Sequence, residues 1–265
     1  MPAEEIVVTQ SAYPEAASEE MIEAGVFYGR RKSKTNPKMK GYVLANRGGL
    51  EIINLEKTLD GLTLAVSFLK EKVKAGGLVL FVGTQPAAQA PIQKLAEEFT
   101  MPFVVNRWLG GTITNFKVLS LRVQHLKKTR ADLASGALLD KYTKKERLDM
   151  EKEVKRLEVL MGGLENLPHE PNVLVVVDPN VHMTAVREAN RMKIPVIALA
   201  NVDSDPDMIE YPVVGNNKSV KSIDWFLGKI IEAMKEGIAE RAKVLKLAEE
   251  AKAEIKPEVK PTPTQ

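Results

Sequence analysis

The chain has 265 residues, no cysteine and a formal net charge of +3 at neutral pH. Without cysteine it cannot form disulfides, thiolate nucleophiles or cysteine-ligated zinc sites, and no apolar run approaches the roughly 20 residues that span a bilayer. We therefore expect a cytoplasmic protein without a membrane segment. The small excess of basic residues is, by itself, only weak evidence for a nucleic-acid partner.

The chain divides into three predicted parts. Residues 1–17 mix Pro, Ala, Glu and Ser without periodicity, which predicts a flexible N-terminal arm. Residues 18–242 predict an α/β core domain, in which Ser18 caps a first short helix that Gly25 ends. Residues 243–265 are rich in Ala, Glu and Lys and predict a flexible C-terminal tail.

A basic loop follows the first predicted helix. Between residues 30 and 40, basic side chains occur with no acid among them. Such a run can bind RNA phosphates by releasing their counterions, although a solvated loop without a ligand has the same composition. The RNA-binding candidates in this loop are Arg30, Arg31, Lys32, Lys34, Asn36, Lys38 and Lys40.

Apolar runs and helical periodicity predict the core. The expected strands cover residues 42–45, 50–53, 78–82, 103–105, 173–177 and 194–199, and the first two form a β-hairpin. The expected helices cover residues 55–75, 87–99 and 184–192, with a last helix that begins near Ser219. Apolar strands that alternate with amphipathic helices require a parallel sheet covered on both faces. The expected fold class is α/β, with a doubly wound, mostly parallel sheet.

A segment of different character interrupts this sheet at about residues 114–163. It is rich in Lys, Arg, Glu and Leu, and its apolar positions step by three or four residues. A break at Ala134-Ser135-Gly136 predicts an inserted antiparallel coiled-coil helical hairpin. Its basic side chains suit either RNA phosphates or simple solvation. The RNA-binding candidates are Lys117, Arg122, Lys127, Lys128, Lys144 and Lys145.

The stretch that leads into this hairpin is difficult to explain by packing alone. Two adjacent glycines allow a close approach of backbone or phosphate, and an arginine beside a tryptophan can stack on nucleotides. Thr114 or Asn115 can also cap the first hairpin helix, so RNA binding and helix entry can coexist. The candidates are Arg107, Trp108, Gly110, Gly111, Thr112, Thr114 and Asn115.

Two features raise the alternative of a nucleotide- or sugar-phosphate-binding α/β enzyme. The Gly83-Thr84 turn resembles a phosphate loop, but Pro86 removes an amide donor and no phosphate-binding motif surrounds it. Asp178 follows a strand and precedes His182, but a carboxylate that caps the next helix explains it more simply. We therefore predict no catalytic residue, no cofactor and no small-molecule substrate.

The alternating carboxylates Asp203, Asp205 and Asp207 suggest a divalent cation such as Mg²⁺, which would bridge to phosphate. The full calcium-loop pattern is absent, so a surface turn is the favoured interpretation. We predict no metal site. A coiled-coil adaptor protein that binds no RNA is a further alternative.

Several spaced motifs carry a resemblance to a known family. They are Asn36-Pro-Lys-Met39, Leu80-Phe-Val-Gly-Thr84, Arg107-Trp-Leu-Gly-Gly-Thr112, Thr114-Asn-Phe116, Gly162-Gly163, Val177-Asp-Pro179, Ile194-Pro195, Asp205-Pro206, Tyr211-Pro212 and Gly215-Asn216. In this order they resemble the bacterial small-subunit ribosomal protein S2 family. The resemblance implies a flavodoxin-like domain with a protruding coiled coil, bound to small-subunit ribosomal RNA near the junction of head and body. It also implies contacts with other small-subunit proteins, help in docking protein S1, and no chemistry.

The chain departs from the family pattern at three places. Phe27, Tyr28 and Arg30 occupy a stretch where the family tends to carry histidines. Gln85 and Pro86 stand where lysines are common, and Asn217 and Lys218 replace acids. We expect individual contacts to differ at these places, without a change of family.

Overall fold

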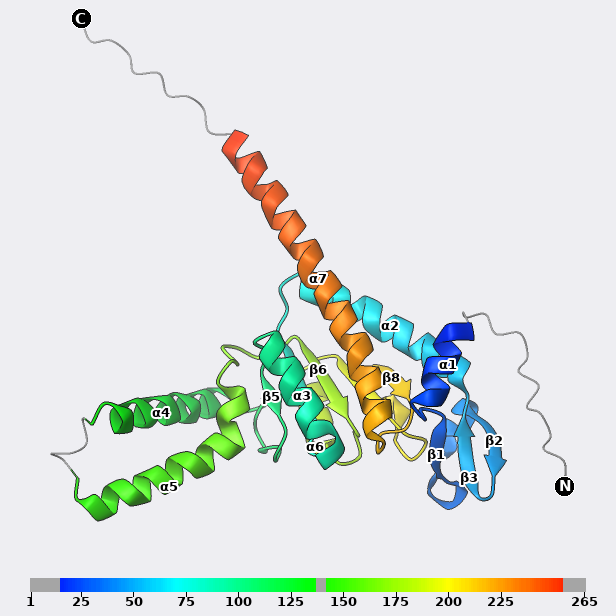
Figure 1. The fold of residues 1–265 in the computed structure, drawn as a ribbon, viewed down its shortest axis with the longest axis horizontal. Coiled ribbons are helices and arrows are strands. Elements are labelled where there is room, and N and C mark those ends of the chain that lie inside the picture. Colours follow the sequence, from blue (N-terminus) through cyan, green and yellow to red (C-terminus); the bar gives the residue numbers. More distant parts are fainter. Residues whose placement is uncertain (1–14, 137–141, 255–265) are drawn as a thin grey trace, which may run out of the picture.

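The computed structural model describes residues 15–136 and 142–254, which form a sheet domain with a helical arm at one end (Figure 1). Residues 1–14 of the predicted arm and the tail beyond residue 254 lie outside this description. Within the described ranges, no helix is both long and apolar enough to cross a bilayer.

A five-stranded parallel sheet forms the centre of the protein. Its strands are β4 (Val79–Val82), β5 (Phe103–Val104), β6 (Val173–Val177), β7 (Val196–Ala200) and β8 (Tyr211–Val214). They lie in the order β5-β4-β6-β7-β8. Numbered along the chain within this sheet, the order is 2-1-3-4-5, the arrangement of flavodoxin-like doubly wound folds. The predicted α/β class is therefore confirmed.

Helices cover both faces of the sheet, as its apolar strands require. Val79 and Phe81 pack toward one face, and Leu80 and Val82 pack toward the other. The first face is covered by α1 (Glu15–Glu23), α2 (Leu55–Lys74), α3 (Pro86–Glu98) and α7 (Val220–Glu254). The second is covered by α6 (Met183–Arg191) and by the inner ends of α4 (Phe116–Ala134) and α5 (Lys144–Met161).

A small antiparallel sheet lies at the other end of the domain from α4 and α5 (Figure 1). It contains β1 (Tyr28–Arg31), β2 (Val43–Arg47) and β3 (Leu50–Ile53) in the order β1-β3-β2. The predicted β2-β3 hairpin is confirmed. Met39 and Ile53 pack against Val202 and Val214, and this contact joins the small sheet to the large one.

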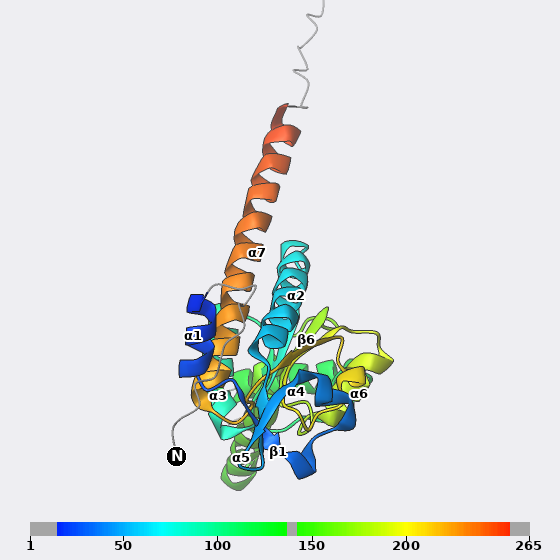
Figure 2. The same ribbon diagram turned by 90° about the vertical axis from the view of Figure 1, so that its right-hand side faces the viewer.

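Two helix ends differ from the prediction, and strands β1 and β8 were not predicted. Helix α1 begins at Glu15, so Ser18 lies inside it and does not cap it. Helix α7 continues past residue 242 to Glu254 and extends beyond α2, the helix on which it packs (Figure 2). Strand β8 was not predicted, because Pro212 lacks an amide donor; the strand tolerates it at the edge of the sheet.

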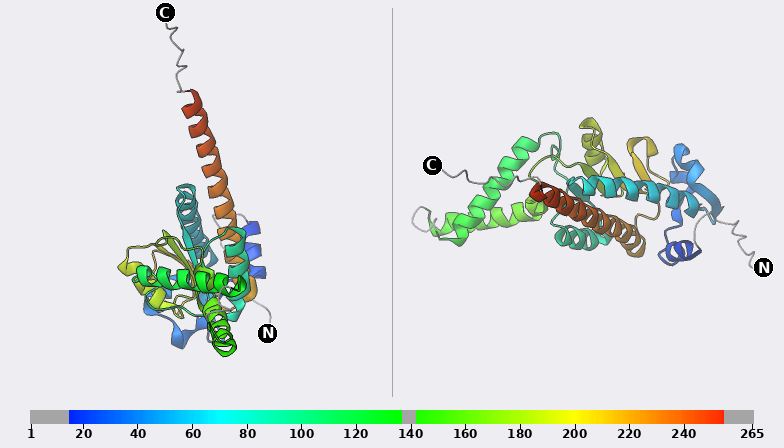
Figure 3. Two further views of the ribbon diagram at one scale, coloured as in Figure 1. Left: turned by 90° about the vertical axis from the view of Figure 1, so that its left-hand side faces the viewer. Right: turned by 90° about the horizontal axis from the view of Figure 1, so that it is seen from above.

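Helices α4 and α5 project from the β5 edge as an antiparallel pair (Figures 1 and 3). Their bounds agree with the predicted insertion, and α4 ends at the predicted break. Leu119, Val123 and Val154 join one apolar cluster with the sheet. Two grooves lie between α4 and α5 and are lined by residues of both helices. Regular coiled-coil packing along the pair therefore stays a prediction.

Candidate nucleic-acid interface

The basic loop spans the end of β1 and the short 3-10 helices η1 (Lys32–Lys34) and η2 (Pro37–Tyr42). Asn36 caps η2, because its side-chain oxygen accepts a hydrogen bond from the Lys38 amide at 3.1 Å. The side-chain oxygen of Asn36 is therefore already used in a hydrogen bond within the protein. Four basic side chains of the loop are exposed and form no ion pair with the described residues: Arg31, Lys32, Lys34 and Lys40.

The other two basic side chains of the loop are paired within the protein. Arg30 donates to Asn217 at 2.9 Å and lies 3.5 Å from Asp203, while Lys38 forms ion pairs with Asp205 at 3.0 Å and with Asp207. The hydrogen bonds that Lys38 donates to Asp207 and Asp205 raise the pKa of Lys38. The aspartates that suggested a cation site thus pair with Arg30 and Lys38. No acid lies within the run itself, as the sequence shows, but the fold brings these acids to it from a distant turn.

The stretch before α4 is held by one carboxylate from α6. Oε1 of Glu188 accepts hydrogen bonds from the Trp108 indole at 3.0 Å and from the Gly111 amide at 2.9 Å. Its Oε2 accepts from the Ile113 amide at 3.1 Å, and from the amide and hydroxyl of Thr114 at 3.2 and 3.1 Å. A carboxylate with five such donors is a strong local anchor.

Glu188 is almost buried, with 8% of its surface exposed. Burial raises its pKa, but the hydrogen bonds from Gly111, Trp108, Thr114 and Ile113 outweigh burial, so its pKa is lowered overall. The carboxylate is therefore charged at neutral pH and fixes the course of the backbone into the hairpin. Sequence reasoning missed this residue.

Anchoring by Glu188 divides the predicted candidates of this stretch into two groups. Trp108 packs against the apolar cluster on the face of the sheet that α4, α5 and α6 cover. Thr112 is buried, and its hydroxyl donates to the Leu109 carbonyl at 2.6 Å. Both side chains therefore serve the fold. Arg107, Gly110 and Asn115 are exposed. Asn115 occupies the N-cap position of α4, as predicted, but its side chain makes no capping hydrogen bond.

The hairpin carries paired and unpaired basic residues. Lys127 donates to the Glu165 carbonyl at 2.9 Å, and Arg130 binds the Glu165 carboxylate through both of its terminal nitrogens, each at 2.9 Å. These contacts join α4 to the segment after α5. The remaining candidates are exposed and have no ion pair in the described part of the chain: Lys117, Arg122, Lys128, Lys144 and Lys145.

The two basic regions lie at opposite ends of the sheet domain. The basic loop is beside the small sheet, and the hairpin projects from the β5 edge (Figures 1 and 3). The structure therefore brings each predicted group together but does not merge the two into one patch.

The strand ends that raised the enzyme alternative contain several polar contacts, and Oδ1 of Asp178 is buried there without a hydrogen-bond partner among the described residues. Asp178 accepts hydrogen bonds from Gln85 and from Lys218, the latter at 2.9 Å. His182 accepts a hydrogen bond from the Thr84 amide at 3.1 Å, and burial lowers the pKa of His182 to about 4. The imidazole is therefore neutral at neutral pH. The prediction that Asp178 caps α6 is wrong, because His182 holds the N-cap position and the Asp178 carboxylate binds Gln85 and Lys218.

Two departures from the family pattern are joined by these contacts. Gln85 and Lys218 both bind Asp178, and Asn217 accepts the hydrogen bond from Arg30. The side chains at these positions thus form hydrogen bonds within the protein, through Asp178 or directly with one another. Among the described residues, no cluster of three or more His, Asp or Glu side chains is arranged to hold a metal ion.

Comparison with known proteins decides the family. Residues 21–237 match the family model described as Ribosomal protein S2. The chain belongs to the ribosomal protein S2 family. The small ribosomal subunit protein uS2 of Thermus thermophilus is 38% identical to it over 247 residues, 92% of this chain and 96% of that protein. The uS2 protein of Bifidobacterium animalis subsp. lactis is 41% identical over 226 residues, 84% of this chain and 74% of that protein.

Membership in the S2 family excludes the enzyme alternative. Proteins of the S2 family are structural components of the ribosome and not enzymes. In agreement with this, the His182 imidazole is neutral and accepts a hydrogen bond from a backbone amide. Among the described residues, the loop and the hairpin both carry exposed basic side chains that form no ion pair within the protein.

Proposed function

We propose that this protein is a structural constituent of the small ribosomal subunit and binds small-subunit ribosomal RNA at both ends of its sheet domain. The observation that carries the proposal is a set of exposed basic side chains without acidic partners, on an S2 family fold. Arg31, Lys34, Lys117 and Lys128 are examples at the two ends. Lys and Arg contacts to phosphates position a protein on folded RNA without reading its sequence.

The finer parts of the proposal concern the place of the protein in the subunit. It binds at the junction of head and body, contacts other small-subunit proteins and helps to dock protein S1, and it acts in the cytoplasm during translation. The resemblance in motifs supports these parts. The separation of the two basic regions also suits a protein that touches two RNA segments.

We also propose that α4 and α5 act as a coiled-coil arm in the bound protein. Their apolar positions recur every three or four residues, and Leu126, Val154 and Met161 belong to one cluster. Arg130 holds the base of the arm through Glu165 and, at 3.5 Å, Glu158. This arm would present Lys117 and Lys128 to RNA.

Sedimentation tests the proposed function. Tagged protein from its own cells should comigrate with small ribosomal subunits in a sucrose gradient. The double change Arg31→Glu with Lys34→Glu should reduce the comigrating fraction and weaken its dependence on salt, because fewer counterions are released. Lys94→Glu with Lys221→Glu is the matched control, since both lysines are exposed outside the proposed regions.

Two results would count against the proposal. Copurification with other proteins but no ribosomal RNA would favour the coiled-coil adaptor. Equal loss in the matched control would mean that net charge, and not the basic loop, governs association.

A further inference from the structure

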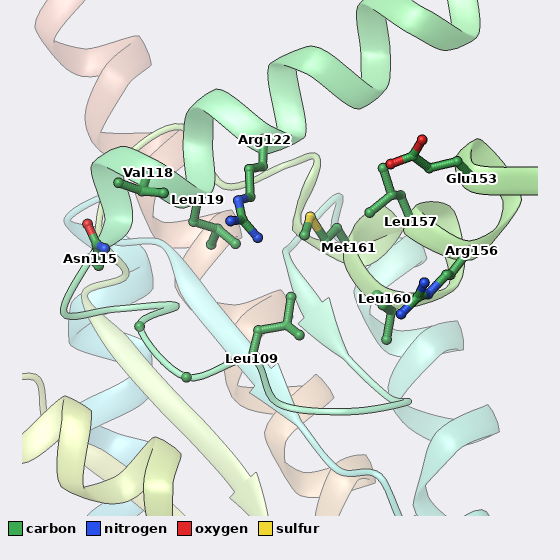
Figure 4. Close-up of a pocket in the computed structure, with 12 residues that line it drawn as sticks. Leu109, Asn115, Val118, Leu119, Arg122, Glu153, Arg156, Leu157, Leu160 and Met161 are labelled. Atoms are coloured by element: carbon green, nitrogen blue, oxygen red, sulfur yellow. The ribbon is translucent and has the colours of Figure 1, made fainter. Parts of the chain in front are cut away.

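A groove of about 410 Å³ lies between α4, α5 and the loop that Glu188 holds (Figure 4). Its floor and walls are mainly apolar and include Leu109, Leu157, Leu160 and Met161. This volume falls in the range of roughly 300–1,000 Å³ that encloses a small molecule or a single chemical group of a larger one. The groove opens at the surface between the two helices.

Charged side chains border the apolar surface. Arg122 extends from α4 and Arg156 from α5 toward the space between the helices (Figure 4). Both are exposed, and neither forms an ion pair with the described residues, in contrast to the neighbouring Arg130. Two unpaired guanidinium groups beside an apolar floor match a ligand that combines an anion with a flat apolar body.

The groove also includes an acceptor. Glu153 lines it from α5, is exposed, and has no hydrogen-bond or ion-pair partner in the described ranges. A carboxylate can accept hydrogen bonds from the exocyclic amino group of a base. Together, these walls offer contacts to a base face, a base edge and a phosphate.

Gly110 lines the groove beside open space. A Cβ atom added at Gly110 would meet no atom within 4 Å, so a side chain there would project into unfilled space. Gly111 differs, because its φ of +89° favours glycine. Gly110 is therefore the position at which a substitution can fill the groove without a clash.

We propose that this groove binds one unpaired nucleotide of small-subunit ribosomal RNA. Its base lies against Leu109, Leu157 and Leu160, and Arg122 and Arg156 hold its phosphate. The proposal rests on the proposed function and assigns a chemical ligand to one part of that surface. A nucleotide is favoured over an acidic peptide, because planar guanidinium groups both stack on bases and bind phosphate in two-pronged geometry.

Filling the groove is the first test. Gly110→Leu places a side chain in open space at the groove and should weaken binding of the full chain to small-subunit ribosomal RNA by roughly tenfold, the size of one lost stacking contact. Gly228→Leu is the matched control, because a Cβ atom there also meets nothing within 4 Å and α7 lies outside the groove. Unchanged affinity in a folded Gly110→Leu protein would overturn the proposal.

Crosslinking is the second test and does not depend on blocking the groove. A photoreactive benzoylphenylalanine at Leu160, which lines the groove, should crosslink to one nucleotide in small subunits that contain the tagged chain. The same group at Val159, which is 60% exposed and does not line the groove, should not mark that nucleotide.

The outcomes separate the two proposals. Comigration with small subunits combined with a Leu160 crosslink only to a protein, or with no crosslink, would overturn the groove assignment and leave the proposed function intact. Absence of comigration would overturn both.

Discussion

At the residue scale, Glu188 shows how one buried charge organises an exposed loop. It lies on the same side of α6 as the buried residues Ala185 and Ala189, where an acid is unusual. That placement was the only signal in the sequence. Its partners lie 74 to 80 residues away along the chain, so their hydrogen bonds could not be inferred from local pattern.

We expect Glu188→Gln to lower the free energy of unfolding by about 2–3 kcal/mol, because an amide cannot accept from donors on both of its ends and leaves buried N–H groups unsatisfied. Urea unfolding would measure the loss. Glu151→Gln, at an exposed position on α5, should change stability little. An equal effect of both substitutions would contradict the anchoring role.

The stability that Glu188 provides depends on pH. The pKa of Glu188 is lower in the folded protein than its ordinary value of 4.5. Its contribution to the free energy of unfolding is therefore fully present above pH 4.5 and is lost as the pH falls through the lowered pKa of the folded protein. Between neutral pH and pH 4.5 the stability difference between wild type and Glu188→Gln should stay constant. It should shrink at lower pH in the same urea measurements.

At the element scale, the basic loop and the aspartate turn form one unit. Asp205 caps the short helix η4 (Pro206–Met208) and binds Lys38 at the same time. Hydrogen bonding to Lys38 lowers the pKa of Asp205 and keeps it charged. On the proposed function, the turn would compete with RNA phosphates for Lys38.

Release of Lys38 should strengthen RNA binding. The change Asp205→Asn with Asp207→Asn removes both competitors, so we expect higher affinity for ribosomal RNA and a salt dependence steeper by about one phosphate contact. Filter binding over a range of salt concentrations would measure both. The control Glu170→Gln with Asp224→Asn makes the same change in net charge at exposed positions outside the loop. If the control behaved alike, bulk charge would be the cause.

At the scale of the whole molecule, the sheet domain separates two basic regions. The small sheet joins it beyond β7 and β8 through Val202 and Val214, while the hairpin leaves from the β5 side. A partner that touches both regions must therefore extend along the domain. We expect mutations at the two ends to act additively on binding of such a partner, because the two regions are distant and share no contacting side chain.

Additivity is the corresponding prediction. Arg31→Ala with Lys34→Ala at one end, and Lys117→Ala with Lys128→Ala at the other, should each weaken binding to ribosomal RNA. The quadruple change should lose the sum of the two free energies. Dissociation constants of the three variants and wild type would check this. No effect from one pair would restrict RNA binding to the other end.

The sequence by itself determined the parallel sheet, most helices and the insertion. Continuous apolar strands can be buried only between helices, and the helical period of residues 114–163 cannot lie in such a sheet. The motifs also determined the family. Strands β1 and β8 were not predicted. Arg30 and Arg31 make β1 polar, and Pro212 lacks the amide donor that a strand residue usually supplies.

Only the tertiary structure decided which candidate side chains are free. In the sequence, Lys38 and Arg31 look alike, and so do Arg130 and Arg122. Folding brings Asp205 and Glu165 from distant segments to the first member of each pair and leaves the second unpaired. Charge pairing depends on distances of a few ångströms between residues far apart in the chain. Composition and spacing therefore predict where charge gathers, and the fold decides which charges remain for a partner.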